Sequence, residues 1–206
     1  MISTANQHWD DTYKTRPMVA EVDFAKSAYK YLRSIPHCTL LDIGCGDGRD
    51  AIYFAQNGIS VTAIDFSAEA IKKLTAVAPE IRASVQDIQD IDFPDASFDA
   101  IYAHLSLHYF DDPTTEAIVQ NIYRMLKKNG LFFVRCKSIH DPLYGKGEKV
   151  EEDTFHFGHT RHFFRREYLE QKLRNFEIIS CNESSASYDG KQSHFVEGVA
   201  RKNRKK

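Results

Sequence analysis

Residues Leu40–Asp50 read LLDIGCGDGRD, an apolar run that leads into three glycines alternating with other residues. We expect Cys38–Ile43 to form a short buried strand and a helix to begin near Arg49. A glycine-rich turn between a strand and a helix lets backbone N–H groups approach a ligand and aims the helix N-terminus at it. This stretch therefore predicts a ligand-binding loop at one edge of a sheet.

The rest of the chain alternates apolar, β-branched runs with helical patterns. The strands expected after the glycine turn cover residues 60–64, 81–86, 98–103 and 131–136. Alternation at this spacing predicts an α/β fold, a doubly wound and mostly parallel sheet with helices on both faces. Two later strand-like runs, 176–181 and 193–200, are expected to form an antiparallel C-terminal hairpin, which makes a seven-stranded sheet.

The length of 206 residues fits a single domain, 1–206. We expect residues 1–36 to form an N-terminal helical cap. Residues 138–164 show no clear period and are expected to form a loop or lid on the substrate side. Residues 201–206 carry five basic side chains and no acid, so we expect a solubilising tail, with contact to RNA or an acidic surface as the alternative.

Composition and charge exclude several classes of protein. The net charge is −2, and it is −7 without the basic tail, which disfavours nucleic-acid binding. No run approaches the roughly 20 apolar residues of a membrane span, and no secretory signal is visible. The four cysteines are scattered and form no C-x-x-C pair, which favours a cytoplasmic protein without a disulfide framework. Nothing in the sequence marks an oligomer interface.

Acidic residues near the glycine turn indicate the kind of ligand. Asp42 lies two residues before Gly44, and Asp65 ends the second strand, where a carboxylate can bind ribose hydroxyls. The dinucleotide form of the turn is G-x-G-x-x-G/A, but Arg49 occupies its last position here. A pyrophosphate disfavours nearby anions, whereas Asp42 and Asp47 suit an ammonium group. S-adenosylmethionine has an ammonium, a sulfonium and an adenosine, and no phosphate.

With this pattern the sequence resembles the class I S-adenosylmethionine-dependent methyltransferases, and more loosely their compact tellurite-resistance and quinone-pathway members. In that family the glycine turn holds the methionine part of the cofactor, and the acid after the second strand binds the ribose. The opening HWDDTYKTRP is similar to an N-terminal element that many members fold over the cofactor. The residues that the resemblance assigns to cofactor binding are Tyr13, Arg16, Asp42, Gly44, Cys45, Gly46, Gly48, Asp65, Phe66, Gln86, Asp87, Ile88, Ala103 and His104.

Several of these residues also have a purely structural interpretation. The glycine turn could serve the fold alone, and Asp87 could cap a turn in an acidic loop. Tyr13 could pack as an amphipathic aromatic side chain, and Phe66 could belong to the core. These alternatives remain open at the level of the sequence.

Histidines gather on the two segments expected at the substrate edge. His104 and His108 follow the fourth strand and are candidate general bases for a hydroxyl or amine acceptor. The residues expected to contact the acceptor are Tyr109, Tyr144, His159 and Arg161. Histidines of the 138–164 segment are expected to line a pocket or to accept protons near neutral pH.

The spacing of His156, His159 and His162 also invites a metal interpretation, since three imidazoles can hold zinc. Gly158 interrupts the run, and no helical frame brings the three rings together. We therefore predict no metal site.

The primary prediction is a methyltransferase that moves the sulfonium methyl of S-adenosylmethionine to a small molecule by in-line displacement and leaves S-adenosylhomocysteine. The alternatives are an NAD-dependent oxidoreductase on a related fold and a non-catalytic S-adenosylmethionine-binding module. An RNA methyltransferase is a further alternative, which the acidic body disfavours.

Overall fold

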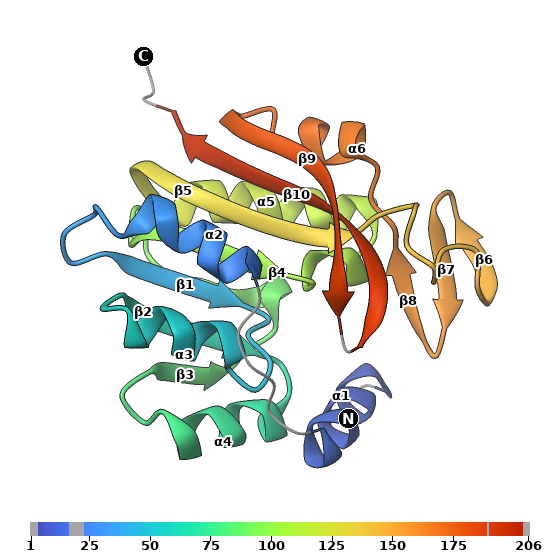
Figure 1. The fold of residues 1–206 in the computed structure, drawn as a ribbon, viewed down its shortest axis with the longest axis horizontal. Coiled ribbons are helices and arrows are strands. Elements are labelled where there is room, and N and C mark those ends of the chain that lie inside the picture. The colour runs from blue at the N-terminus through green and yellow to red at the C-terminus, as the bar shows by residue number, and fades with distance from the viewer. Residues whose placement is uncertain (1–3, 17–22, 189, 204–206) are drawn as a thin grey trace.

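A computed structural model describes residues 4–16, 23–188 and 190–203. Its centre is a seven-stranded sheet in the order β3-β2-β1-β4-β5-β10-β9 (Figure 1). The strands are β1 Thr39–Ile43, β2 Ser60–Asp65, β3 Arg82–Val85, β4 Phe98–His104, β5 Leu126–Lys137, β9 Phe176–Tyr188 and β10 Lys191–Lys202. Strands β1 to β5 are parallel, and β10 pairs antiparallel with both β5 and β9. The predicted fold class is confirmed.

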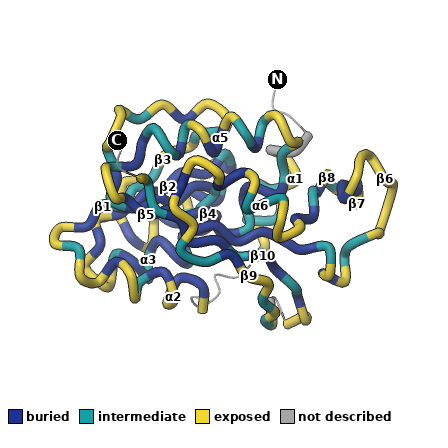
Figure 2. The backbone as a smooth tube through the Cα atoms, turned by 90° about the horizontal axis from the view of Figure 1, so that it is seen from above, coloured by how far each residue is buried: buried dark blue, intermediate teal, exposed yellow. Residues whose placement is uncertain are grey.

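Helices cover both faces of this sheet. They are α1 Thr4–Thr15, α2 Asp23–Leu32, α3 Arg49–Gln56, α4 Ala68–Val77, α5 Asp112–Met125 and α6 Arg166–Lys172, with short 3-10 helices η1 Ile88–Asp90 and η2 Leu107–Tyr109. Phe24, Phe54 and Leu74 pack α2, α3 and α4 on one face, while Ile122 and Leu169 pack α5 and α6 on the other. The sheet is therefore the buried middle layer (Figure 2).

Capping side chains explain where two of the helices begin. The Ser67 hydroxyl accepts from the Ala70 N–H at 3.2 Å at the start of α4, and Asp111 Oδ1 accepts from the Thr114 N–H at 2.9 Å at the start of α5. Helix α5 ends at Met125, where the fully buried Leu126 already pairs with Phe98 of β4.

The segment 138–164 is more ordered than the predicted loop. It contains an antiparallel sheet of β6 Glu148–Glu151, β7 Thr154–Phe157 and β8 His159–His162. Its strands are only four residues long and turn at Asp153 and Gly158, both with positive φ, so they are too short to show a period. Figure 1 shows this small sheet beside the carboxyl ends of the parallel strands.

The N-terminal cap predicted for residues 1–36 divides into two different elements. Helix α2 is part of the helix layer, since its Phe24, Ala28 and Leu32 side chains are buried against the sheet. Helix α1 lies outside the helix layers, at the carboxyl edge of the sheet and next to the N-terminus of α4 (Figure 1). Residues 1–3 and 17–22 lie outside the described residues.

The basic tail predicted for 201–206 begins later than expected. Arg201 and Lys202 belong to β10, where Lys202 Nζ donates to the Leu126 carbonyl at 2.6 Å. Residues 204–206 lie outside the described residues. No helix within the described ranges is long and apolar enough to cross a membrane.

Candidate functional site

The glycine loop between β1 and α3 has a left-handed backbone at three positions. Gly44, Gly46 and Gly48 have φ of +73°, +58° and +88°, a region that L side chains rarely adopt. The Gly44 N–H donates to the Ile64 carbonyl at 2.9 Å, which holds the loop against β2. A Cβ at Gly46 would collide with the Tyr13 hydroxyl. Glycine is therefore required where α1 approaches the loop.

Asp65, at the end of β2, joins this loop to α4. Its carboxylate oxygens accept from the Gly46 N–H at 2.8 Å and from the Ser67 N–H at 2.9 Å. The side chain is 4% exposed, and burial raises the pKa of Asp65 to about 6 despite these two hydrogen bonds. Asp65 nevertheless lines a cavity, so its oxygens are placed to accept from ligand hydroxyls as well.

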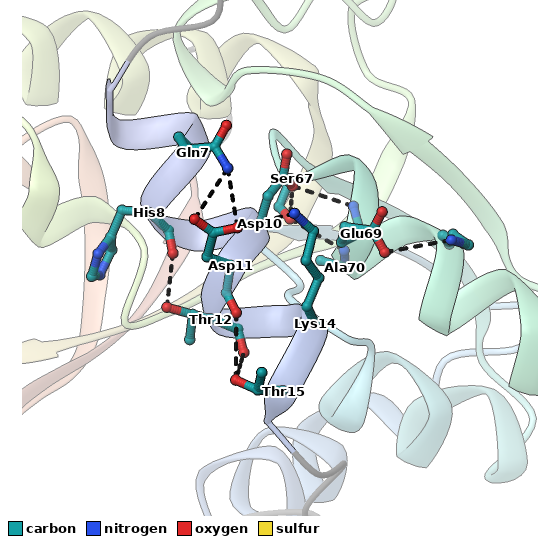
Figure 3. Close-up of polar contacts among 11 residues, drawn as sticks. Gln7, His8, Asp10, Asp11, Thr12, Lys14, Thr15, Ser67, Glu69 and Ala70 are labelled. Atoms are coloured by element: carbon teal, nitrogen blue, oxygen red, sulfur yellow. Dashed lines mark hydrogen bonds and ion pairs between the residues drawn. The ribbon is translucent and has the colours of Figure 1, made fainter.

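Helix α1 is anchored to the N-terminus of α4 (Figure 3). Asp10 Oδ1 accepts from the Ser67 hydroxyl at 2.6 Å and from the Glu69 N–H at 3.3 Å. Lys73 of α4 donates to the Arg16 carbonyl at 2.8 Å, just after α1 ends. These contacts tie the segment from Asp10 to Arg16 to α4, and Tyr13, between them, lies against Gly46 of the glycine loop.

A small cavity of about 50 Å³ lies against the loop, and its lining includes Tyr13, Arg16, Asp42, Asp47, Arg49 and His104. Among the described residues, Asp42 Oδ2 and Asp47 Oδ2 are buried and have no hydrogen-bond partner. Burial raises the pKa of both carboxyl groups. An ammonium group would supply both the missing hydrogen bonds and the opposite charge, so this cavity suits a positively charged group of a ligand.

Asp50 and His104 form a buried pair beside the small cavity. His104 Nδ1 lies 2.7 Å from Asp50 Oδ2, and Asp50 also accepts from the Tyr102 hydroxyl and from Arg49 Nε, both at 3.1 Å. Burial opposes ionisation of Asp50, but His104 and Arg49 outweigh it and lower the pKa of this carboxyl. His104, a predicted general base, is thus engaged with Asp50 and lines the small cavity rather than the larger one.

A larger cavity of about 560 Å³ adjoins the small one and shares Tyr13 and Gly44 with it. One part of its lining consists of residues that the sequence assigns to the cofactor, namely Tyr13, Gly44, Asp65, Phe66, Asp87 and Ile88. The other part is rich in rings and includes His8, Trp9, Ser106, Tyr109, His156 and His159. The cavity therefore has a carboxylate-bearing half and an aromatic half.

The aromatic half is assembled from three separate elements. The Trp9 ring of α1 lies 5.4 Å from the Tyr109 ring of η2, which lies 5.2 Å from the His159 ring of β8. His159 in turn lies 5.3 Å from the His8 ring. The Arg161 guanidinium lies 5.6 Å from the centre of the Tyr109 ring. This wall therefore depends on α1, η2 and the small sheet together.

Other predicted residues lie away from both cavities. His108 is 1% exposed, and its ring lies 4.4 Å from Tyr109 without lining either cavity. The Tyr144 hydroxyl donates to Asp153 at 2.7 Å and its ring packs against Phe155 and Phe163, which places this residue outside both cavities. The predicted residues that also fall outside the cavity linings are Gly48, Gln86, Ala103 and Arg161.

Several lining residues are absent from the predicted site residues, and Trp9 and Ser106 are two of them. Trp9 precedes Asp10 and Asp11 in the opening HWDDTYKTRP, and its place in that element is the sequence feature that could have marked it as a cavity residue. Ser106 follows Leu105, which has a φ of +58° in the turn after β4. Nothing in the sequence marks that turn as strained.

Residues 40–130 match a family model described as a methyltransferase domain. The matched residues include the glycine turn, Asp65 and Asp87, which carry the resemblance to the class I S-adenosylmethionine-dependent methyltransferases.

Two relatives of this chain carry names that describe O-methyltransferases. The malonyl-[acyl-carrier protein] O-methyltransferase of Enterobacter lignolyticus is 33% identical over 136 residues, which are 65% of this chain and 52% of that protein. The ubiquinone biosynthesis O-methyltransferase of Xanthomonas oryzae pv. oryzae is 30% identical over 135 residues, 63% of this chain and 56% of that protein. The chain spans about half the length of these relatives.

The fold of this chain has a counterpart among solved structures. A crystal structure of a S-adenosylmethionine-dependent methyltransferase from Methanosarcina mazei superposes with a TM-score of 0.75 at 23% identity. The match covers 85% of this chain and 97% of the other. It therefore extends well beyond residues 40–130.

Proposed function

We propose that this chain transfers the methyl group of S-adenosylmethionine to a small-molecule acceptor by in-line displacement and releases S-adenosylhomocysteine. The observation that carries the proposal is the pair of adjoining cavities that meet at Tyr13 and Gly44. The small cavity is lined by glycine-loop residues and carboxylates, and the large cavity by further carboxylates together with aromatic rings. A cationic cofactor and an uncharged or electron-rich acceptor can occupy the two adjoining cavities at once.

The chain offers a partner for each polar part of the cofactor. Asp42 and Asp47 would bind the ammonium group, because their unpartnered oxygens border the small cavity. Asp65 would accept from the ribose hydroxyls, and Phe66 and Ile88 would pack on the adenine, since all three line the large cavity. Each assignment uses a side chain that the fold has already buried or oriented.

Asp87 is proposed to meet the adenine edge. It lines the large cavity while its Oδ1 accepts from the Gln89 N–H at 2.9 Å. That hydrogen bond leaves the second carboxylate oxygen with capacity to accept from a ligand amino group. The turn-capping role considered from the sequence and the ligand role are therefore compatible.

The bound cofactor supplies a methyl group on a sulfonium and a neutral thioether as the leaving group. The task of the chain is to hold the acceptor in line with that methyl and to keep water out. Trp9 and Tyr13 of α1 border the cavity together with Tyr109 and His159, and the Trp9 ring contacts both of the latter rings. We assign His104 a positioning role, because its pairing with Asp50 shapes the methionine side of the site.

An oxygen nucleophile is the proposed acceptor atom. The two relatives described above are named O-methyltransferases, which supports this choice for a chain that shares about a third of their residues over its matched part. A cavity of about 560 Å³ is of a size suited to small ligands.

The experiment that tests the proposal is a thermal-shift panel. S-adenosylmethionine or S-adenosylhomocysteine at 100 times its dissociation constant should stabilise the protein by about 2.7 kcal/mol. NAD(H) should not stabilise it, because the buried carboxylates Asp42 and Asp47 disfavour a pyrophosphate beside the loop. Stabilisation by NAD(H) alone would refute the proposal.

A second measurement separates an enzyme from a module that only binds. The protein is incubated with S-adenosylmethionine and a panel of phenols, thiols and amines, and methylated product is detected by mass spectrometry. Product from an oxygen acceptor supports the proposal. Cofactor binding with no product from any acceptor supports the binding module instead.

A further inference from the structure

Buried polar atoms without partners collect behind the aromatic half of the large cavity. Among the described residues, Ser106 Oγ, His108 Nδ1, His159 Nδ1 and Arg161 Nε are buried and make no hydrogen bond. Ser106 and His159 line the cavity, and Arg161 is 9% exposed. Buried polar groups in folded proteins nearly always have partners, so a cluster of this kind points to a polar ligand atom.

The contact between Arg161 and His159 assigns the tautomer of the imidazole. A guanidinium nitrogen of Arg161 lies 2.5 Å from His159 Nε2. A guanidinium can only donate, so Nε2 accepts and the neutral ring carries its proton on Nδ1. Burial and the charge of Arg161 lower the pKa of His159 to about 4, which keeps the ring neutral near pH 7. His159 is therefore a hydrogen-bond donor rather than the proton acceptor that its segment suggested.

The charges around this donor are mainly basic. Arg161, His8 and His156 act on His159, and together with burial they disfavour a positive charge on its ring. His108 is affected in the same way by Arg161 and Lys137.

Three carboxylates line the same cavity: Asp65 and Asp87, which are assigned to the cofactor, and Asp111, which is exposed and accepts from the Thr114 N–H to cap α5. A neutral N–H that is itself held by a guanidinium is a strong donor to a negatively charged oxygen. The aromatic half of the cavity therefore favours an oxyanion, while its opposite half favours a cation.

We propose that the acceptor is a hydroxylated aromatic compound bound as its oxyanion, with the oxygen accepting from His159 Nδ1–H and the ring lying against Trp9 and Tyr109. This inference rests on the proposed function and deepens it. Arg161 acts through His159, so it is a positioning residue that selects the ionised acceptor.

The transfer step then needs no general base. The hydroxyl proton passes to solvent when the acceptor binds, because the His159 N–H and Arg161 stabilise the anion. The oxyanion forms the new O–CH₃ bond as the S–CH₃ bond breaks, and the electron pair of that bond stays on sulfur. One negative and one positive charge are thereby neutralised, which yields a methyl ether and a neutral thioether.

The test uses 4-nitrophenol, whose phenolate absorbs visible light while its neutral form does not. The protein is first saturated with S-adenosylhomocysteine, which cannot react, and then titrated into 4-nitrophenol at one pH unit below the solution pKa of the phenol. About a tenth of the free phenol is ionised there. We expect at least half of the bound phenol to be ionised, as seen in its visible absorbance.

Two variants test whether Arg161 and His159 cause the ionisation of the bound 4-nitrophenol. Arg161→Gln should return the bound phenol to the ionised fraction it has in solution, and His159→Phe should do the same while keeping a ring next to Trp9. Arg166→Gln is the matched control, because Arg166 is an exposed arginine of α6 paired with Glu170. If Arg161→Gln fails to fold, His159→Phe alone decides the question.

Each outcome has a separate meaning when S-adenosylhomocysteine binding is measured by calorimetry on the same preparations. Failure to bind S-adenosylhomocysteine overturns the proposed function itself. Normal S-adenosylhomocysteine binding, with 4-nitrophenol either unbound or bound in its neutral form, overturns the acceptor inference alone. An ionised fraction that is equal in the wild type and in His159→Phe also overturns it.

Discussion

Asp65 is expected to make cofactor affinity depend on pH. Its burial raises its pKa to about 6, and ligand hydroxyls bind the ionised carboxylate more strongly. With that pKa, about a tenth of Asp65 is ionised at pH 5 and about nine tenths at pH 7. The dissociation constant of S-adenosylhomocysteine should therefore fall about tenfold between these two pH values.

The same pKa has the opposite effect on the stability of the ligand-free protein. The folded-state pKa of about 6 lies above the ordinary aspartate value of 3.8, so the folded state binds more protons than the unfolded state between these pH values. The stability that protonated Asp65 contributes is complete below about pH 4 and is lost as the pH rises through 6. The shift corresponds to about 3 kcal/mol at 1.36 kcal/mol per unit.

Isothermal titration with S-adenosylhomocysteine at pH 5, 6, 7 and 8 measures the affinity. Asp65→Asn has a single acceptor oxygen, so it cannot accept from both the Gly46 and the Ser67 N–H groups, and it loses the charged partner of the ribose. We expect a loss of about 1.5 to 3 kcal/mol at pH 7 and no tenfold dependence on pH. Asp90→Asn, on the exposed side of η1, is the matched control. A tenfold dependence that persists in Asp65→Asn would refute the reasoning.

Two further substitutions test other parts of the site. Gly46→Ala should weaken S-adenosylhomocysteine binding by at least about tenfold, since its Cβ would displace the Tyr13 hydroxyl. Gly58→Ala, also at positive φ but with no atom near the added Cβ, should cost about 1 kcal/mol of unfolding free energy and leave the affinity unchanged. Asp50→Asn should lower the free energy of unfolding by about 3 kcal/mol in denaturant titrations at pH 7, because it breaks a buried pair with His104. The stability difference between wild type and Asp50→Asn should shrink as the pH falls. The folded-state pKa of Asp50 is lowered, so the stability that its carboxylate contributes is present near neutral pH and is lost in acid. A stability difference that stays constant down to acid unfolding would contradict this.

The glycine loop and the acids around it could be predicted because their signals are local. Gly44, Gly46 and Gly48 follow directly on an apolar strand, and all three adopt the left-handed backbone that favours glycine. The parallel sheet then brings Asp65 to the same edge, since the carboxyl ends of neighbouring parallel strands meet there. These inferences needed only strand order and residue type.

The aromatic half of the cavity could not be predicted in the same way. Its wall depends on Trp9, Tyr109 and His159, which lie in three elements far apart in the sequence. Tyr144 and His159 come from the same segment, yet only His159 lines the cavity. His159 lies in β8, whereas Tyr144 lies in a turn before β6 and packs its ring against Phe155 and Phe163. Such packing is a tertiary property that residue type and spacing do not reveal.

Ser67 takes part in two networks at once, and this has a kinetic consequence. Its N–H donates to Asp65, and its hydroxyl donates to Asp10 of α1. If ligand binding at Asp65 favours the docked position of α1 on α4 by some factor, thermodynamic linkage requires that undocking α1 lowers the affinity for the ligand by the same factor. Weakening the Asp10 contact is then expected to shorten the residence time of ligand far more than it slows arrival. The anchoring of one N-terminal helix would thereby govern how quickly spent cofactor leaves, and with it the rate of repeated turnover.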